Sequence, residues 1–219
     1  MSISKNILAV KNTIPQDVTL VAVSKTKPTN EILEAYHAGQ RVFGENKIQE
    51  MAAKWKEMPK DIEWHMIGHV QRNKVKYMAP FVSLIHAVDS VRLLTEINKQ
   101  ALKSNRVIDC LLQIKIADEE SKFGMSEADV QALLDSEEIK TLQNVKAIGL
   151  MGMATFTNDD NQLKEEFGYL KSIYLKLKTQ HTDLHILSMG MSSDCTLAIK
   201  NGSTMVRVGS AIFGARNYN

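Results

Sequence analysis

The chain of 219 residues carries 27 lysine and arginine residues against 25 aspartate and glutamate residues, which gives a formal net charge of +2 at pH 7. Hydrophobic residues make up 44% of the sequence and charged residues 24%, as is usual for a soluble globular protein. The charges alternate in sign and form no basic block, so the sequence predicts neither a nucleic-acid partner nor a membrane partner.

Short apolar runs alternate with segments of helical periodicity along the whole chain. Eight runs are predicted strands, at residues 19–24, 42–44, 63–67, 84–88, 108–114, 146–151, 185–188 and 205–209. Amphipathic segments between them are predicted helices, at residues 31–38, 47–56, 91–103, 127–134, 161–179 and 195–200. Pro28 is expected at a first helical position, and Gly39 and Gly202 are expected just past helix ends.

No linker rich in proline, glycine or serine divides the chain, so we expect a single domain over residues 1–219. Eight strands that alternate with helices predict an α/β fold, a parallel (β/α)₈ barrel of the TIM type. An open, doubly wound sheet is the structural alternative. In the barrel, residues at the carboxyl ends of the strands are expected to form the site.

Lys25 is the first candidate for that site. It follows the apolar run Val21-Ala22-Val23 at the end of the first predicted strand, and Lys27 lies two residues further on. A partly buried lysine near a second cation can have a lowered pKa, which makes a neutral amine available to an aldehyde. The alternative is that Lys25 is a solvated surface group.

A phosphate-binding site is predicted after the last two strands. Gly190, Met191 and Ser192 connect a strand end to a predicted helix start, where unpaired backbone N–H groups favour an anion. Gly209 and Ser210 follow the last strand in the same way. Loops after strands seven and eight form the recurrent phosphate site of this barrel class.

Arg207 completes the candidate site. It lies inside the last apolar strand, where a charged side chain needs a partner. Its guanidinium is predicted either to form an internal salt bridge or to donate a hydrogen bond to a cofactor ring nitrogen. Because arginine keeps its proton, that nitrogen would stay unprotonated and the ring would be a weak electron sink. An aldehyde-binding lysine and a phosphate site together point to pyridoxal 5'-phosphate.

Histidines and cysteines indicate no metal centre. His65 and His69 are four apart in a predicted strand and loop, and no cysteine or carboxylate completes a zinc site; His65 is expected to point into the barrel. Cys110 and Cys195 are far apart and are expected to be reduced thiols, as in a cytoplasmic protein. The sequence has no signal-peptide core and no run of the ~18 apolar residues that a membrane span requires.

The motifs at the predicted strand ends closely resemble those of the pyridoxal phosphate homeostasis proteins, the YggS/PROSC family. The resemblance runs through Val21-Ala22-Val23-Ser24-Lys25, through residues 43–50, 64–68 and 71–74, and through residues 187–192 and 206–216. It covers nearly the whole chain. The segment His69-Val70-Gln71-Arg72 departs from the family's pattern, but it includes none of the assigned cofactor contacts.

This resemblance implies a barrel like the N-terminal barrel of alanine racemase, a fold type III pyridoxal phosphate protein. Lys25 would hold the cofactor covalently as a Schiff base (an internal aldimine), and Arg207 would address the ring nitrogen. Ser192, Gly209, Ser210 and the backbone near Gly190 and Met191 would hold the phosphate. Asn46 would lie close to the cofactor. The family handles vitamin B6 and influences amino-acid pools without a settled catalytic activity.

The resemblance leaves a carrier and an enzyme as alternatives. A racemase of this type needs a second acid/base, usually a tyrosine supplied through an added β-domain and dimerisation. The sequence ends at Asn219, soon after the last predicted strand, and Tyr218 is a poorly placed substitute. We therefore expect a monomeric carrier that releases pyridoxal phosphate or transfers it to apo-enzymes. An amino-acid racemase is the first alternative, and a cofactor-free Schiff-base aldolase that uses Lys25 is the second.

Overall fold

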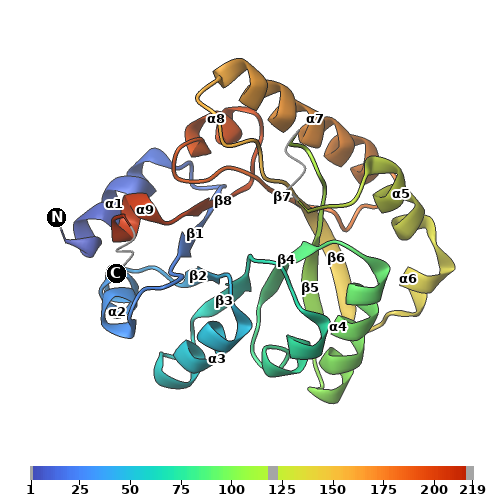
Figure 1. The fold of residues 1–219 in the computed structure, drawn as a ribbon, viewed down its shortest axis with the longest axis horizontal. Helices are drawn as coiled ribbons and strands as arrows, with labels where there is room; N and C mark the ends of the chain where they lie inside the picture. Colours follow the sequence, from blue (N-terminus) through green and yellow to red (C-terminus); the bar gives the residue numbers. More distant parts are fainter. Residues whose placement is uncertain (1, 118–122, 216–219) are drawn as a thin grey trace.

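A computed structural model describes residues 2–117 and 123–215, and its centre is a closed barrel of eight parallel strands (Figure 1). Each strand pairs with the next, and β8 pairs with β1 through Thr19–Met205 to Ala22–Val208. The strands are β1 Thr19–Val23, β2 Val42–Glu45, β3 Glu63–Met66, β4 Leu84–Val88, β5 Ile108–Gln113, β6 Val145–Met151, β7 Ile186–Ser188 and β8 Met205–Val208. The prediction of a parallel barrel is confirmed, and the alternative of an open, doubly wound sheet is wrong.

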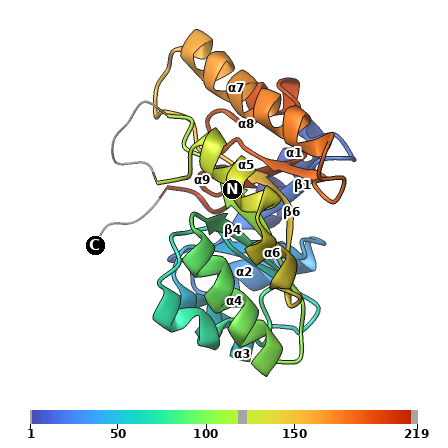
Figure 2. The ribbon, with the colours of Figure 1, turned by 90° about the vertical axis from the view of Figure 1, so that its right-hand side faces the viewer.

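Helices surround the barrel on the outside, as the view turned by 90° also shows (Figure 2). They are α1 Ile3–Thr13, α2 Thr29–His37, α3 Ile48–Glu57, the 3-10 helix η1 Arg72–Tyr77, α4 Val91–Lys103, α5 Glu127–Asp135, α6 Glu137–Thr141, α7 Asp160–Lys178, α8 Cys195–Lys200 and α9 Ser210–Phe213. Over the described ranges, none of these helices has the length and apolar character needed to cross a membrane.

All the predicted strands and helices are present, with small differences at their ends. Helices α1, η1, α6 and α9 were not predicted from the periodicity. The prediction for Pro28 is wrong by one residue: Pro28 has extended backbone angles, and its carbonyl accepts from Glu31 and Ile32, so it caps α2 instead of opening it. Gly39 and Gly202 follow α2 and α8 with φ of +87° and +95°, as predicted.

The barrel interior contains an apolar layer and a polar layer. The apolar layer combines buried residues from β1, β4, β5, β6 and β8, so it lies inside the ring of strands; its members are Val21, Leu84, Ala87, Leu111, Ile148, Met151 and Met205. The polar layer consists of His65, His86, Ser188 and Arg207, all buried. A larger apolar cluster packs the strands against the helices. Apolar burial of this kind is the main stabilising contribution to the fold.

Candidate functional site

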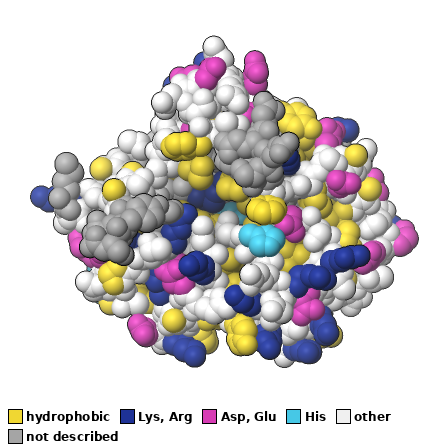
Figure 3. Space-filling view, in the orientation of Figure 1, with side chains coloured by type: hydrophobic (Ala, Val, Ile, Leu, Met, Phe, Trp, Pro, Cys, Tyr) yellow, Lys and Arg dark blue, Asp and Glu magenta, His cyan; other side chains and the backbone are white. Residues whose placement is uncertain are grey.

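A pocket of about 700 Å³ lies where the strands meet their following loops. Its lining residues come from segments far apart in the sequence; they are Val23, Lys25, Lys27, Asn46, Ile67, Met153, Phe156, Met191, Ser192, Ser193, Arg207, Gly209, Ser210, Ala211, Phe213 and Gly214. Most of them follow the carboxyl ends of β1, β2, β3, β6, β7 and β8, which is where active sites of such barrels form. Figure 3 shows a hollow near the middle of this face, with lysine and arginine side chains beside it.

Seven of the predicted site residues line this pocket, namely Lys25, Asn46, Met191, Ser192, Arg207, Gly209 and Ser210. Gly190 does not line it, because this glycine is buried beneath α8. It has a φ of +96°, and a Cβ there would lie 2.5 Å from the Cβ of Ala198. The missing side chain therefore makes room for the helix.

Asn46 is brought to the pocket by a close approach of two loops. A Cβ on Gly68 would lie 2.5 Å from the carbonyl oxygen of Asn46 and 2.8 Å from its Cα. Gly68, in the loop after β3, is therefore the residue that lets the loop after β2 pack so closely.

Two loops at the other side of the pocket are joined through Ser192. The backbone N–H of Gly209 donates to Ser192 Oγ at 3.0 Å, which links the loop after β7 to the start of α9. The N–H of Met191 donates to the carboxylate of Asp194, so this amide is already used. The described residues provide no acceptor for the N–H groups of Ser210 and Ala211 in the first turn of α9. These two amides are available to an anion.

The Arg207 guanidinium is buried at the base of the pocket and held by three hydrogen bonds. Nη1 donates to the Ser188 carbonyl at 3.1 Å and to Ser188 Oγ at 2.7 Å, and Nη2 donates to the Gly152 carbonyl at 3.0 Å. Burial lowers the pKa of Arg207 to about 10, and the nearby charge of Asp194 opposes this shift. Arg207 is thus a cation at neutral pH, and no internal salt bridge to it occurs within the described ranges.

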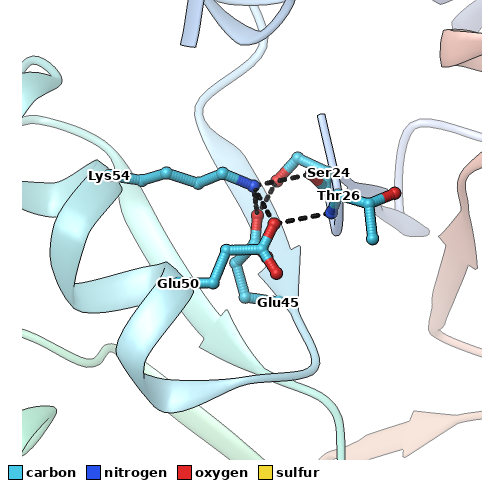
Figure 4. Close-up of polar contacts among 5 residues, drawn as sticks. All are labelled: Ser24, Thr26, Glu45, Glu50 and Lys54. Carbon is cyan, nitrogen blue, oxygen red and sulfur yellow. Dashed lines mark hydrogen bonds and ion pairs between the residues drawn. The ribbon is translucent and has the colours of Figure 1, made fainter. Parts of the chain in front are cut away.

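A buried ion-pair network holds the backbone on both sides of Lys25 (Figure 4). Lys54 Nζ, on α3, donates to the Ser24 carbonyl at 2.8 Å and to one oxygen each of Glu45 and Glu50 at 2.7 Å. Glu50 in turn accepts from the backbone N–H of Thr26 at 2.6 Å. Since Ser24 and Thr26 flank Lys25, α3 positions the segment that carries the candidate amine.

Thr26 and Glu45, two members of this network, are each in an unfavourable state. Thr26 has a φ of +64°, a left-handed conformation that is unfavourable for a β-branched residue. Glu45 also accepts from Ser24 Oγ at 2.6 Å, whereas its other oxygen, Oε2, is buried and has no partner among the described residues. Desolvation by burial raises the pKa of Glu45, and the nearby Lys54 opposes that shift.

Lys27 and His65, the other basic residues considered from the sequence, have contacts of their own. Lys27 Nζ donates to the Phe213 carbonyl at 2.7 Å and pairs with Glu31 at 3.4 Å, so it ties α2 to α9. Its effect on Lys25 stays a prediction. His65 points into the barrel, as predicted, where it contacts His86. In the ranges that the structure describes, no cluster of histidine, cysteine or acidic residues is arranged to bind a metal.

The sequence did not identify the apolar side of the pocket. Ile67 follows β3, Met153 and Phe156 follow β6, and Phe213 ends α9. Phe156 is 84% exposed at the pocket. Single apolar residues in loops carry no sequence signal for a site.

Comparisons with known proteins agree with this architecture. The family "Alanine racemase, N-terminal domain" matches residues 1–217. The pyridoxal phosphate homeostasis protein of Vibrio alginolyticus is 41% identical over 210 residues, which cover 94% of this chain and 89% of that protein. The chain belongs to the pyridoxal phosphate homeostasis protein family.

Solved structures place this family member beside PipY of Synechococcus elongatus PCC7942. PipY with pyridoxal phosphate bound superposes with a TM-score of 0.88 at 35% identity, and PipY without it superposes with 0.91 at 36%. Both comparisons cover 97% of this chain and 100% of PipY. An alanine racemase of Clostridium difficile 630 has a TM-score of 0.82 at 13% identity, so it shares the fold; this chain spans 58% of its length.

Proposed function

We propose that this protein binds pyridoxal 5'-phosphate and holds it as a Schiff base on Lys25. The observation that carries the proposal is the single pocket that combines the Lys25 amine, the buried Arg207 cation and the open amides of α9. These groups fit an aldehyde, a ring nitrogen and a phosphate respectively. The bound PipY structure and the names of the relatives support this choice of ligand.

Each residue has a defined part in this proposal. When bound, pyridoxal phosphate supplies an aldehyde that a lysine amine can attack. The α9 amides of Ser210 and Ala211 bind the phosphate, while Ser192 keeps Gly209 in place. Arg207 donates to the ring nitrogen, and Asn46 contacts the cofactor from the loop after β2, the strand that pairs with the one before Lys25.

We further infer a role in intracellular vitamin B6 homeostasis, in which a single-domain, monomeric protein in the cytoplasm releases the cofactor or transfers it to apo-enzymes, with effects on amino-acid metabolism. The described pocket lining contains no tyrosine, the usual second acid/base of an alanine racemase. This favours reversible holding over racemisation. Tyr218, the substitute considered from the sequence, lies outside the described residues.

Replacing Lys25 by alanine is expected to abolish the Schiff base. The hydrogen bonds of Ser24 and Thr26 position the backbone that carries the Lys25 amine, and they position no other amine. Phosphate-anchored binding should remain, at lower affinity. The measurement is the absorption spectrum of purified protein with pyridoxal phosphate, followed by borohydride reduction and peptide mass mapping. The wild-type protein should show an imine band and a pyridoxyl adduct on Lys25.

Lys27→Met is the matched control, since it removes a lysine that also lines the pocket. This variant should keep both the imine band and the adduct on Lys25. An unchanged imine band in Lys25→Ala would contradict the assignment of Lys25. The absence of any band or adduct in the wild-type protein would overturn the proposed cofactor.

Ser192→Ala should weaken binding of pyridoxal phosphate by about 2- to 12-fold, the equivalent of one lost hydrogen bond. The reason is that the Gly209 N–H loses its acceptor and the start of α9 loosens. Binding of pyridoxal, which lacks the phosphate, should change little. Titration of both ligands tests this, and equal losses for the two would show that Ser192 does not act on the phosphate.

A further inference from the structure

Four buried side chains form a continuous hydrogen-bonded row across the barrel interior. They come from β3, β4, β7 and β8, and they end at the guanidinium in the pocket. His65 Nδ1 lies 3.0 Å from His86 Nε2, His86 Nδ1 lies 3.3 Å from Ser188 Oγ, and Ser188 Oγ accepts from Arg207 at 2.7 Å. Of these four residues, Arg207 lines the pocket, and the other three do not.

The position of every proton in this row follows from its arginine end. Arginine can only donate, so Ser188 Oγ accepts from Arg207. The hydroxyl hydrogen of Ser188 is then directed to its other neighbour, His86 Nδ1. Because Nδ1 accepts, neutral His86 carries its hydrogen on Nε2 and donates it to His65 Nδ1. His65 is therefore also the Nε2–H tautomer.

The reverse order of protons is less favourable. If His86 donated from Nδ1, Ser188 Oγ would accept two hydrogen bonds and its own hydrogen would have no acceptor among the described residues. Ser188 is fully buried, so no solvent would satisfy that hydrogen. A positive His86 would in addition face the Arg207 cation.

Both imidazoles are held neutral by their surroundings. Burial lowers the pKa of His65 to about 3 and lowers the pKa of His86 well below its ordinary value, with the charge of Arg207 as a smaller cause for His86. Arg207 is thus the only charged member of the row.

We propose that His86, backed by His65, is a positioning residue that orients the Arg207 guanidinium toward the cofactor ring through the Ser188 hydroxyl. This inference rests on the proposed function, in which Arg207 faces the ring nitrogen. Three of the five guanidinium N–H groups are used by Ser188 and Gly152, which leaves two for other acceptors. With the Ser188 hydroxyl held by His86, the plane of the guanidinium is fixed before any ligand binds.

The proton order is tested in the free protein, without cofactor. Long-range ¹H–¹⁵N spectra of histidine-labelled protein at pH 7 distinguish the two neutral tautomers and the charged form, and the His65→Gln and His86→Asn variants assign the signals. We expect His65 and His86 both to be Nε2–H tautomers. An Nδ1–H tautomer or a positive charge on His86 would overturn the inference.

The effect on Arg207 is tested with His86→Leu, which removes the acceptor, and His86→Asn, whose side-chain oxygen can replace Nδ1. The first should weaken binding of pyridoxal phosphate by about 2- to 12-fold and alter the absorption band of the bound cofactor, and the second should restore both. Leu111→Ala is the control: it opens a cavity in the same interior, and the leucine side chain that it removes forms no hydrogen bond to the row. It should lower thermal stability and leave the spectrum unchanged.

The outcomes separate the two proposals. If the wild-type protein forms no imine with pyridoxal phosphate, the proposed function fails, whatever the tautomers are. If it forms the imine but His86→Leu keeps the wild-type spectrum and affinity, the positioning role of His86 fails alone. A spectral change in Leu111→Ala equal to that in His86→Leu would also contradict it, because a general loosening of the barrel would then explain both.

Discussion

Replacing Lys54 by methionine is expected to lower the free energy of unfolding by about 3–5 kcal/mol, the usual result of removing one partner of a buried ion pair. Methionine fills a similar volume but leaves the Glu45 carboxylate, which is fully buried, without its counter-charge. It also removes the hydrogen bond to the Ser24 carbonyl. Urea denaturation followed by circular dichroism measures the loss.

Lys140→Met is the matched control. Lys140 also pairs with a glutamate on its own helix, Glu137, but both side chains are largely exposed, so its replacement should change stability little. The double variant Lys54→Met/Glu45→Gln should recover part of the loss, because no unpaired charge then remains buried. A Lys54→Met variant as stable as Lys140→Met would show that the buried pair contributes nothing.

The loss caused by Lys54→Met should depend on pH in a defined direction. The folded-state pKa of Glu45 is raised by burial, so protonation of Glu45 stabilises the folded protein as the pH falls through that raised value. Without Lys54 the pKa rises further. The difference in the free energy of unfolding between the wild type and Lys54→Met should therefore be largest at neutral pH and should become smaller toward pH 5. Denaturation at the two pH values tests the sign.

The same network links stability to the site, because it flanks Lys25. With Lys54 removed, the Ser24 carbonyl and the strained turn at Thr26 lose support. Schiff-base formation should then slow even under conditions where the variant remains folded. Burial of the Lys54 charge is costly, and a rigid backbone at Lys25 is the benefit that we infer from it.

The barrel could be predicted from the sequence because its strands are short apolar runs separated by helical periodicity, and local patterns of this kind carry the topology. The positions of three site residues at the pocket could be predicted for the same reason: Lys25 and Ser192 follow such runs, and Arg207 lies inside one. Helix α1 was missed although its cap is local, with Ser2 Oγ accepting from the Lys5 N–H; its hydrogen bond from Asn6 to the Ile212 carbonyl, by contrast, depends on tertiary structure.

Other features could not be predicted because they join distant positions. Lys54 on an amphipathic helix has the pattern of a solvated residue, yet it is 6% exposed. His86 and Ser188 are 102 residues apart, and only the closed barrel brings them together. Gly190 was assigned to an anion-binding loop from the sequence, and that role stays a prediction; the contact of its missing side chain with α8 could not be predicted, because it too joins separate elements.

Arg207→Gln is expected to weaken pyridoxal phosphate binding by about 10- to 150-fold and to shift the absorption band of the bound cofactor. These are the effects of losing a hydrogen bond from a charged donor. Glutamine has a shorter side chain with a single amide nitrogen, whereas Arg207 uses two nitrogens to reach the Ser188 and Gly152 carbonyls, so the amide would also be misoriented. Equilibrium titration followed by absorption and fluorescence measures both effects on folded protein.

Two further variants separate charge from geometry at this position. Arg207→Lys keeps the cation but loses the planar fork of donors, so its affinity should fall between those of wild type and Arg207→Gln, while its spectrum should resemble that of Arg207→Gln. Arg41→Gln removes an arginine that pairs with Asp61 far from the pocket and should leave both properties unchanged. If Arg207→Gln binds with unaltered affinity and an unaltered spectrum, Arg207 does not contact the ring, and the orientation imposed by His86 and Ser188 serves only the fold.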